Sequence, residues 1–69
     1  MTDTFELNGR QIVLKAPSDR VIAERVVGHI QRRLVEDDWR PYRSQSDALR
    51  TWARLGGIRA QVLEALNLI

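Results

Sequence analysis

The dipeptide Asn8-Gly9, inside the stretch FELNGRQIVLKA, constrains the fold of this chain more than any other feature. Both residues accept the positive φ that a type I′ turn requires, and alternating apolar residues flank them. A two-residue loop sets one register for a hairpin over residues 3–16, whose apolar face then carries Phe5, Leu7, Ile12 and Leu14. A lone hairpin is marginal in water, so this face is expected to pack on helices.

Apolar residues at helical spacing follow Pro17 and predict a long helix over residues 18–38. The apolar positions are Ile22, Val26, Ile30 and Leu34, flanked by Ala23, Val27 and Val35. We expect Ser18 to cap the N-terminus of this helix, with Asp19 in its first turn. Gly28 lies mid-helix, where glycine costs about 1 kcal/mol relative to alanine, so we expect the hairpin backbone to approach it closely.

Two further helices follow a linker over residues 39–44, where Pro41 prevents the first helix from continuing. Ser44 and Asp47 fit a capping box that opens a second helix over residues 45–55. The pair Gly56-Gly57 ends it, and the apolar pattern from there predicts a third helix over residues 58–68. The sequence therefore predicts an α+β fold of order ββααα, a hairpin packed on three helices, in one small domain of residues 1–69.

Charge is distributed unevenly along a chain whose formal net charge is +2. Residues 1–38 hold six basic and seven acidic side chains, whereas residues 39–69 hold five arginines and two acids. Ten of the eleven basic residues are arginine, which pairs with phosphate or carboxylate in a bidentate manner. The C-terminal half thus favours an anionic partner, although a GC-rich bacterial or phage genome would also give an arginine-rich composition.

Few residues of the sequence suit catalysis or metal binding. There is no cysteine, and the one histidine, His29, lies mid-helix without further ligands near it in the sequence. The serines that could act as nucleophiles are better explained as caps or linker residues: Ser18, Ser44 and Ser46. The acidic run 36–38 is expected to be a solvated helix face. We therefore expect a non-enzymatic cytoplasmic protein with no catalytic residues, no metal, no cofactor and no membrane segment.

The segment TWARLGGIRAQVLEAL, residues 51–66, carries a recognisable spacing. Trp52-Ala53 is an apolar-plus-small pair, Gly57 falls four residues after Ala53, and Ile58 follows that glycine directly. The second half has apolar residues to seat a helix at Leu63 and Leu66. Over these residues the chain resembles the helix-turn-helix of DNA-binding regulators.

That resemblance implies DNA as the partner and assigns roles to particular residues. Arg59 and Gln61 would lie at the front of the recognition helix and discriminate bases, while Arg50 and Arg54 would contact phosphates. A reader of two half-sites is expected to be a homodimer. The chain departs from the usual pattern at Gly56, which adds a second glycine to the turn.

The linker offers a different interpretation, a binding site for a protein. Aromatic and arginine side chains dominate contact energy at interfaces, and here they alternate as Trp39, Arg40, Tyr42 and Arg43. They would bind an acidic host protein such as RNA polymerase; alternatively, the two aromatic rings cover the open end of the core.

Size and layout resemble those of small phage-encoded or bacterial transcription regulators. This resemblance implies transcription regulation, through DNA or through host machinery. A structural role in a phage, such as a head–tail joining component, is the remaining hypothesis.

Overall fold

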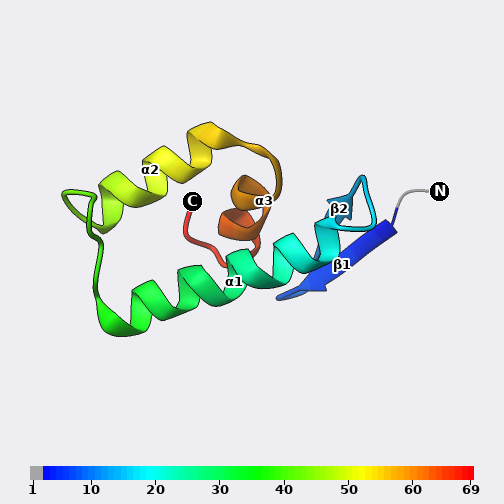
Figure 1. The fold of residues 1–69 in the computed structure, drawn as a ribbon, viewed down its shortest axis with the longest axis horizontal. Helices are drawn as coiled ribbons and strands as arrows, with labels where there is room; N and C mark the ends of the chain where they lie inside the picture. The colour runs from blue at the N-terminus through cyan, green and yellow to red at the C-terminus, as the bar shows by residue number, and fades with distance from the viewer. Residues whose placement is uncertain (1–2) are drawn as a thin grey trace.

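The computed structural model describes residues 3–69, which form a hairpin followed by three helices (Figure 1). Strands β1 (Asp3–Leu7) and β2 (Arg10–Leu14) are antiparallel neighbours in a two-stranded sheet. The helices are α1 (Asp19–Glu36), α2 (Gln45–Leu55) and α3 (Gly57–Ala65). The α+β class and the order ββααα are therefore confirmed. Met1 and Thr2, included in the predicted domain, lie outside the described residues.

The hairpin has the turn and the register that its sequence predicts. Asn8 and Gly9 both have positive φ, 53° and 80°, as a type I′ turn requires. Phe5 is paired with Ile12 across the two strands. Ile12 and Leu14 are buried, so the predicted apolar face of the hairpin is the one that packs on the core.

The N-terminus of α1 is fixed differently from the prediction. The helix begins at Asp19, and the side chain of Ser18 makes no capping hydrogen bond. Instead, the carboxylate of Asp19 accepts hydrogen bonds from the backbone amides of Lys15 at 2.8 Å and Ala16 at 3.0 Å. A charged acceptor bonds backbone amides more strongly than a hydroxyl does, so Asp19 fixes the turn between β2 and α1.

The C-terminus of α1 lies at Glu36 rather than at residue 38. Asp37 is left-handed, with a φ of 50°, and this conformation ends the helix. The guanidinium of Arg33 donates to the backbone carbonyls of Asp38 and Arg40. Arg33 therefore holds the chain as it leaves the helix, several residues before Pro41.

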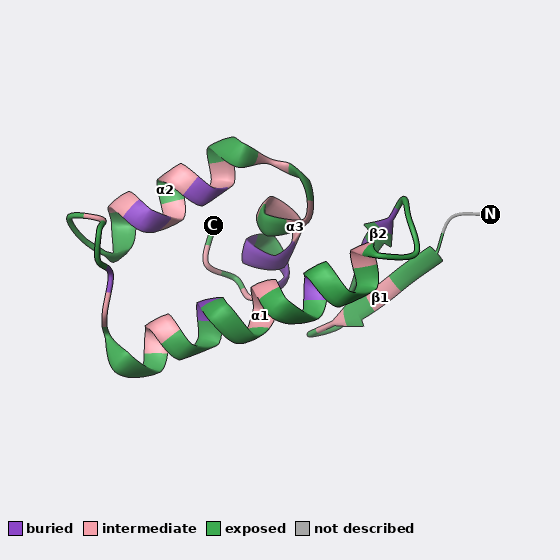
Figure 2. Cartoon of the chain, in the orientation of Figure 1, coloured by how far each residue is buried: buried purple, intermediate pink, exposed green. Residues whose placement is uncertain are grey.

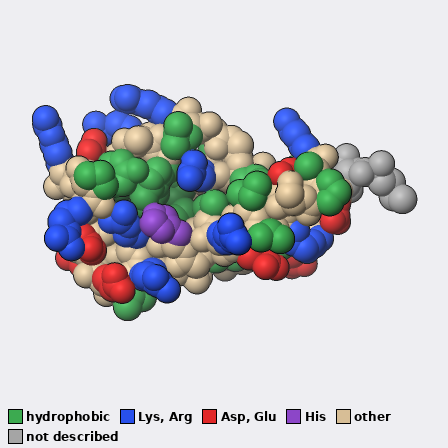
Figure 3. All heavy atoms as spheres, in the orientation of Figure 1, with side chains coloured by type: hydrophobic (Ala, Val, Ile, Leu, Met, Phe, Trp, Pro, Cys, Tyr) green, Lys and Arg blue, Asp and Glu red, His purple; other side chains and the backbone are tan. Residues whose placement is uncertain are grey.

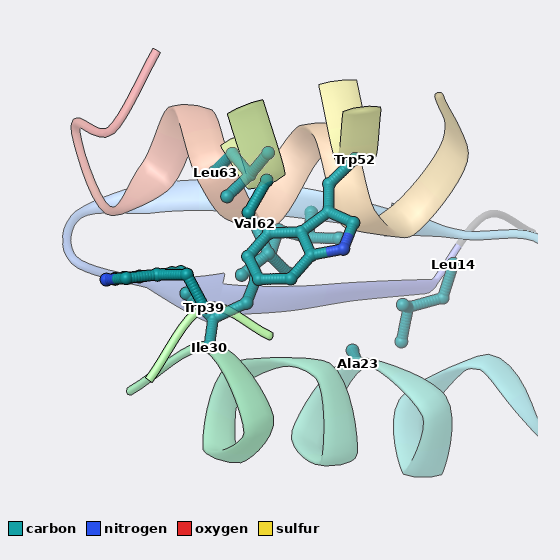
Figure 4. Close-up of a cluster of buried hydrophobic side chains, with 9 residues drawn as sticks. Leu14, Ala23, Ile30, Trp39, Trp52, Val62 and Leu63 are labelled. Carbon is teal, nitrogen blue, oxygen red and sulfur yellow. The ribbon is translucent and has the colours of Figure 1, made fainter. Parts of the chain in front are cut away.

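Two expectations about the faces of α1 are wrong. Its buried residues are Ala23 and Ile30, whereas the predicted core position Ile22 is 44% exposed. Ala23 belongs to the core cluster that includes Leu14 of the hairpin, so the smaller neighbour faces inward (Figure 4). Gly28 is exposed and no atom beyond its own turn of α1 lies within 4 Å of the place where its Cβ would stand, so the hairpin does not approach it.

Helix α2 has the predicted bounds and a modified capping box. The Oγ of Ser44 accepts a hydrogen bond from the amide of Asp47 at 3.2 Å. The carboxylate of Asp47 in turn accepts a hydrogen bond from the amide of Arg43 at 3.2 Å, rather than from the amide of Ser44 as in the usual capping box. The side chains thus satisfy two backbone donors, one of them just outside the helix.

Only Gly56 separates α2 from α3. Gly56 and Gly57 have positive φ, 66° and 62°, which glycine adopts without steric cost. Helix α3 ends at Ala65, earlier than the predicted residue 68, because Asn67 is left-handed with a φ of 59°. The amide of Leu68 then donates to the carbonyl of Leu63 at 2.9 Å, the longer bond of a Schellman motif.

Helix α3, the last in the sequence, occupies the centre of the molecule. It packs against α1, α2 and β2, and it lies between the other two helices in Figure 1. Its fully buried Val62 and Leu63 meet Ile12, Ile30 and Trp52 in one core cluster, with Trp52 projecting from α2 toward α1 (Figure 4). The buried sides of all three helices thus face inward (Figure 2).

Within residues 3–69 there is no helix with the length and apolar character needed to cross a membrane.

Candidate nucleic-acid interface

The two predicted base-reading residues lie on different sides of α3. Positions two residues apart differ by about 200° around a helix. Arg59 is exposed and lines a hollow that α1 also borders. The Oε1 atom of Gln61 accepts a hydrogen bond from the amide of Val13 at 2.9 Å, which ties the outer edge of β2 to α3. Gln61 is therefore engaged within the fold.

The hairpin turn also covers the C-terminal end of α3. The side-chain amide of Asn8 donates to the carbonyl of Ala65 at 2.8 Å, and Arg10 donates to the carbonyl of Glu64 at 3.3 Å. Asn8 thus satisfies a carbonyl that the end of the helix leaves unpaired, whereas the carbonyl of Glu64 also accepts from the amide of Asn67 at 3.0 Å. The surface that α3 leaves exposed is small and consists of Gly57, Arg59 and Glu64.

Arg50 and Arg54, the predicted phosphate contacts, lie one turn apart on the exposed side of α2. Trp52, on the opposite side of this helix, is buried and forms part of the hollow that Arg59 lines. Arg50 and Arg54 therefore point away from that hollow. The structure does not bring the four residues implied by the helix-turn-helix resemblance onto one surface.

The aromatic residues of the alternative site close one end of the core. Trp39 is buried and its Nε1 donates to the carboxylate of Asp37 at 2.8 Å. The hydroxyl of Tyr42 accepts from Nε1 of Trp52 at 3.0 Å, and these two rings meet edge to face at 5.5 Å. The rings are thus held within the fold, as in the core-covering interpretation of this linker.

The linker arginines are exposed, but one of them has a partner. The guanidinium of Arg40 donates to both carboxylate oxygens of Asp38 at 3.0 Å. These hydrogen bonds, with a further one from the Arg40 amide, lower the pKa of Asp38 to about 2. The side chain of Arg43 makes no hydrogen bond or ion pair within the described part of the chain.

Hydrogen bonding separates the arginines into two groups. Arg20, for example, donates to the carboxylate of Asp3 at 3.0 Å and the carbonyl of Thr4 at 3.1 Å, which ties α1 to β1. The fold uses four arginine side chains in this way: Arg10, Arg20, Arg33 and Arg40. The remaining six are all exposed and bond to no partner among residues 3–69: Arg25, Arg32, Arg43, Arg50, Arg54 and Arg59. We call these six the unpaired arginines.

Some of the unpaired arginines border a groove along α1. A hollow of about 200 Å³ is lined by Arg25 and His29 of α1, Trp52 of α2 and Arg59 of α3. A second depression, of about 310 Å³, shares two of these residues and lies along α1 alone, lined by Arg25, Gly28, His29 and Arg32. On this face the single histidine, drawn purple, has Lys and Arg side chains on several sides (Figure 3).

Arg25 and Arg32 were not among the site residues predicted from the sequence. The near-neutral charge of residues 1–38 concealed them, although two of the acids in that half, Asp3 and Asp19, are bonded to other groups of the fold. Their separation of seven residues, two helical turns, is the signal that places both on one face of a helix.

Within residues 3–69 no three His, Asp or Glu side chains are grouped so that they would hold a metal ion. Comparisons with protein-family models, with curated proteins and with solved structures found no match.

Proposed function

We propose that this chain is a small, non-enzymatic, cytoplasmic protein of phage or bacterial origin that binds DNA and regulates transcription. The observation that carries the proposal is the set of six unpaired arginines on α1, α2, α3 and the linker. Each is a cation with no carboxylate partner in the described chain, and exposed arginines of this kind bind the phosphate backbone by releasing counterions. Regulation of transcription is the role that the helix-turn-helix resemblance implies.

Contacts to DNA divide between backbone and bases in this proposal. Arg50 and Arg54 contact phosphates from the outer side of α2. Arg59 lines the hollow from which those two residues point away, and it is the residue of α3 that remains exposed to approach a base edge. Gln61 has no reading role here, because its side-chain oxygen is bonded to the hairpin.

The structure favours DNA over the predicted protein site in the linker. Anchors of protein interfaces are exposed aromatic or apolar side chains that become buried on binding. Trp39 and Tyr42 already donate or accept hydrogen bonds within the fold, and Trp39 is 9% exposed. The linker therefore offers arginines without the aromatic anchors that an interface with RNA polymerase would need.

The salt dependence of DNA binding tests this function. Fluorescence anisotropy with a labelled random-sequence duplex would be recorded over a series of salt concentrations. Arg50→Ala and Arg54→Ala should each lower the slope of log K against log salt by about one unit, since each removes one phosphate contact. Lys15→Ala, which removes an equal charge from the hairpin end, serves as the matched control and should change the slope less.

Recognition of a specific DNA sequence is tested separately from general affinity for DNA. With a duplex selected from a random pool, Arg59→Ala should cost about 1–3 kcal/mol of specific binding and relax preference at one base pair. A selected-to-random affinity ratio near one for the natural protein would contradict sequence reading. Sedimentation of the complex shows whether two copies bind each site, as a reader of two half-sites requires.

A further inference from the structure

We propose that α1 seats a nucleic-acid sugar–phosphate backbone over Gly28, between Arg25 and Arg32 and opposite Arg59. This inference rests on the proposed DNA-binding function and names a surface that the helix-turn-helix resemblance does not include. The three arginines and the glycine line two hollows that share Arg25 and His29 and so form one groove.

The spacing of the cations along the groove suits a repeating anion. Arg25 and Arg32 are seven residues apart, which corresponds to about 10 Å along a helix axis. Successive phosphates of one DNA strand advance by about 3.4 Å along the duplex axis, so this distance spans about three nucleotides. Neither Arg25 nor Arg32 forms an ion pair in the described part of the chain, so both guanidinium groups are available.

The open space over Gly28 is a second feature, besides the arginine spacing, that indicates a bound ligand. A glycine in the middle of a helix destabilises it, and close approach of another backbone is the usual compensation. No other element of the described chain approaches Gly28, because no atom beyond its own turn of α1 lies within 4 Å of the place for its Cβ. The bare helix surface instead forms part of the depression between Arg25 and Arg32, where a bulky sugar–phosphate chain can come close.

The groove suits a polyanion better than a protein surface. The core of a protein interface is depleted in charge and rich in exposed apolar side chains. The large hydrophobic residues exposed in this structure lie outside both hollows: Val13, Val21, Ile22, Val35, Leu55 and Ile69. Trp52, which lines the hollow, is only 4% exposed and is not available as an anchor.

The most direct test of this inference fills the depression at Gly28 with a larger uncharged side chain. Gly28→Leu places an apolar side chain in open space and replaces glycine with a strong helix former. Its melting temperature should rise by about 4–8 °C, as a gain of about 1 kcal/mol does in a domain of this size. Its affinity for a labelled random duplex should nevertheless fall at least about fivefold, corresponding to roughly 1 kcal/mol. Gln31→Leu adds the same side chain elsewhere on exposed α1 and should leave affinity unchanged.

Removal of charge gives an independent measurement. Arg25→Ala and Arg32→Ala should each reduce the salt slope by about one unit, and more than the control Lys15→Ala does. If Gly28→Leu is stable and binds DNA as the natural protein does, and both arginine variants behave like Lys15→Ala, the groove is not the seat of the backbone.

Failure of this inference is distinguishable from failure of the proposed function. Loss of binding in Arg50→Ala and Arg54→Ala, with no change in the α1 variants, would overturn the inference and retain DNA binding. Absence of duplex binding by the natural protein at low salt would overturn both. Competition by poly-L-glutamate as strong as that by unlabelled DNA would assign the groove to an acidic protein instead.

Discussion

Gly9 is the residue on which the hairpin turn depends most directly, because its φ is 80°. Gly9→Val should destabilise the protein by about 1–3 kcal/mol, since a β-branched residue is strained in this conformation. Gly9→Asn is the matched control, because asparagine tolerates left-handed backbone, and it should cost clearly less. Urea unfolding measures both values, and equal losses in the two variants would contradict the argument from φ.

Asp38 contributes to the acid stability of the folded protein through its pair with Arg40. Its folded pKa is about 2, lowered first by the hydrogen bonds from the Arg40 side chain, against about 4 for an unfolded aspartate. The depressed pKa contributes stability that is present above the unfolded pKa and is lost as pH falls through about 4 toward 2. A pH titration followed by NMR should show Asp38 ionised at pH 3 in the folded protein. In Arg40→Ala the pKa of Asp38 should return toward 4, and an unchanged value would contradict the pairing.

Two isoleucines of α1 allow a test of which side of this helix packs in the core. Ile30 is 1% exposed, so Ile30→Ala should cost about 2–4 kcal/mol through lost burial and a residual cavity. Ile22→Ala makes the same change on the same helix at a residue that is 44% exposed, and its effect should be much smaller. Thermal unfolding followed by circular dichroism compares the two. Similar losses would mean that the helix is rotated from the orientation described.

Gln61 makes one of three side-chain hydrogen bonds that join α3 to the hairpin. Gln61→Ala should cost about 0.5–1.5 kcal/mol, the usual net contribution of a hydrogen bond. Hydrogen exchange at the Val13 amide should become faster, because Gln61 accepts its proton at 2.9 Å. Gln31→Ala, at an exposed position of α1, is the control and should leave Val13 protected. Unchanged exchange in Gln61→Ala would show that this bond is not formed in solution.

For the helices, the sequence predicted which ones exist better than it predicted which of their sides face the core. The same periodic pattern includes Ile22 and Ala23, and periodicity alone cannot choose between adjacent positions on the edge of a face. Ala23 is the one of the two that is buried, because its small side chain packs beside the hairpin. Ser18 was a valid cap by residue type, but its backbone is right-handed helical, with φ −69° and ψ −16°, rather than extended as a capping residue needs.

The whole molecule is elongated, 40 × 21 × 20 Å, with the hairpin at one end and the linker at the other (Figure 1). Helix α3 joins these ends through contacts to β2, α1 and α2. We expect one cooperative transition, in which tryptophan fluorescence from Trp39 and Trp52 and the amide signals of the hairpin have the same urea midpoint. Unfolding of the hairpin at lower urea than the tryptophan end would show that α3 does not couple them.

By itself, the sequence determined the class, the element order, the hairpin register and the bounds of α2. These depend on interactions between near neighbours in the chain, such as the Asn8-Gly9 turn and the bond between Ser44 and Asp47. Tertiary structure decided which side chains remain exposed. Sequence spacing grouped Arg59 with Gln61 as base-reading residues. In the structure, packing of α3 against the hairpin hydrogen-bonds Gln61 to Val13, whereas Arg59 remains exposed. Tertiary structure also brought Arg59 to the same groove as Arg25, and no local pattern encodes this proximity of distant segments.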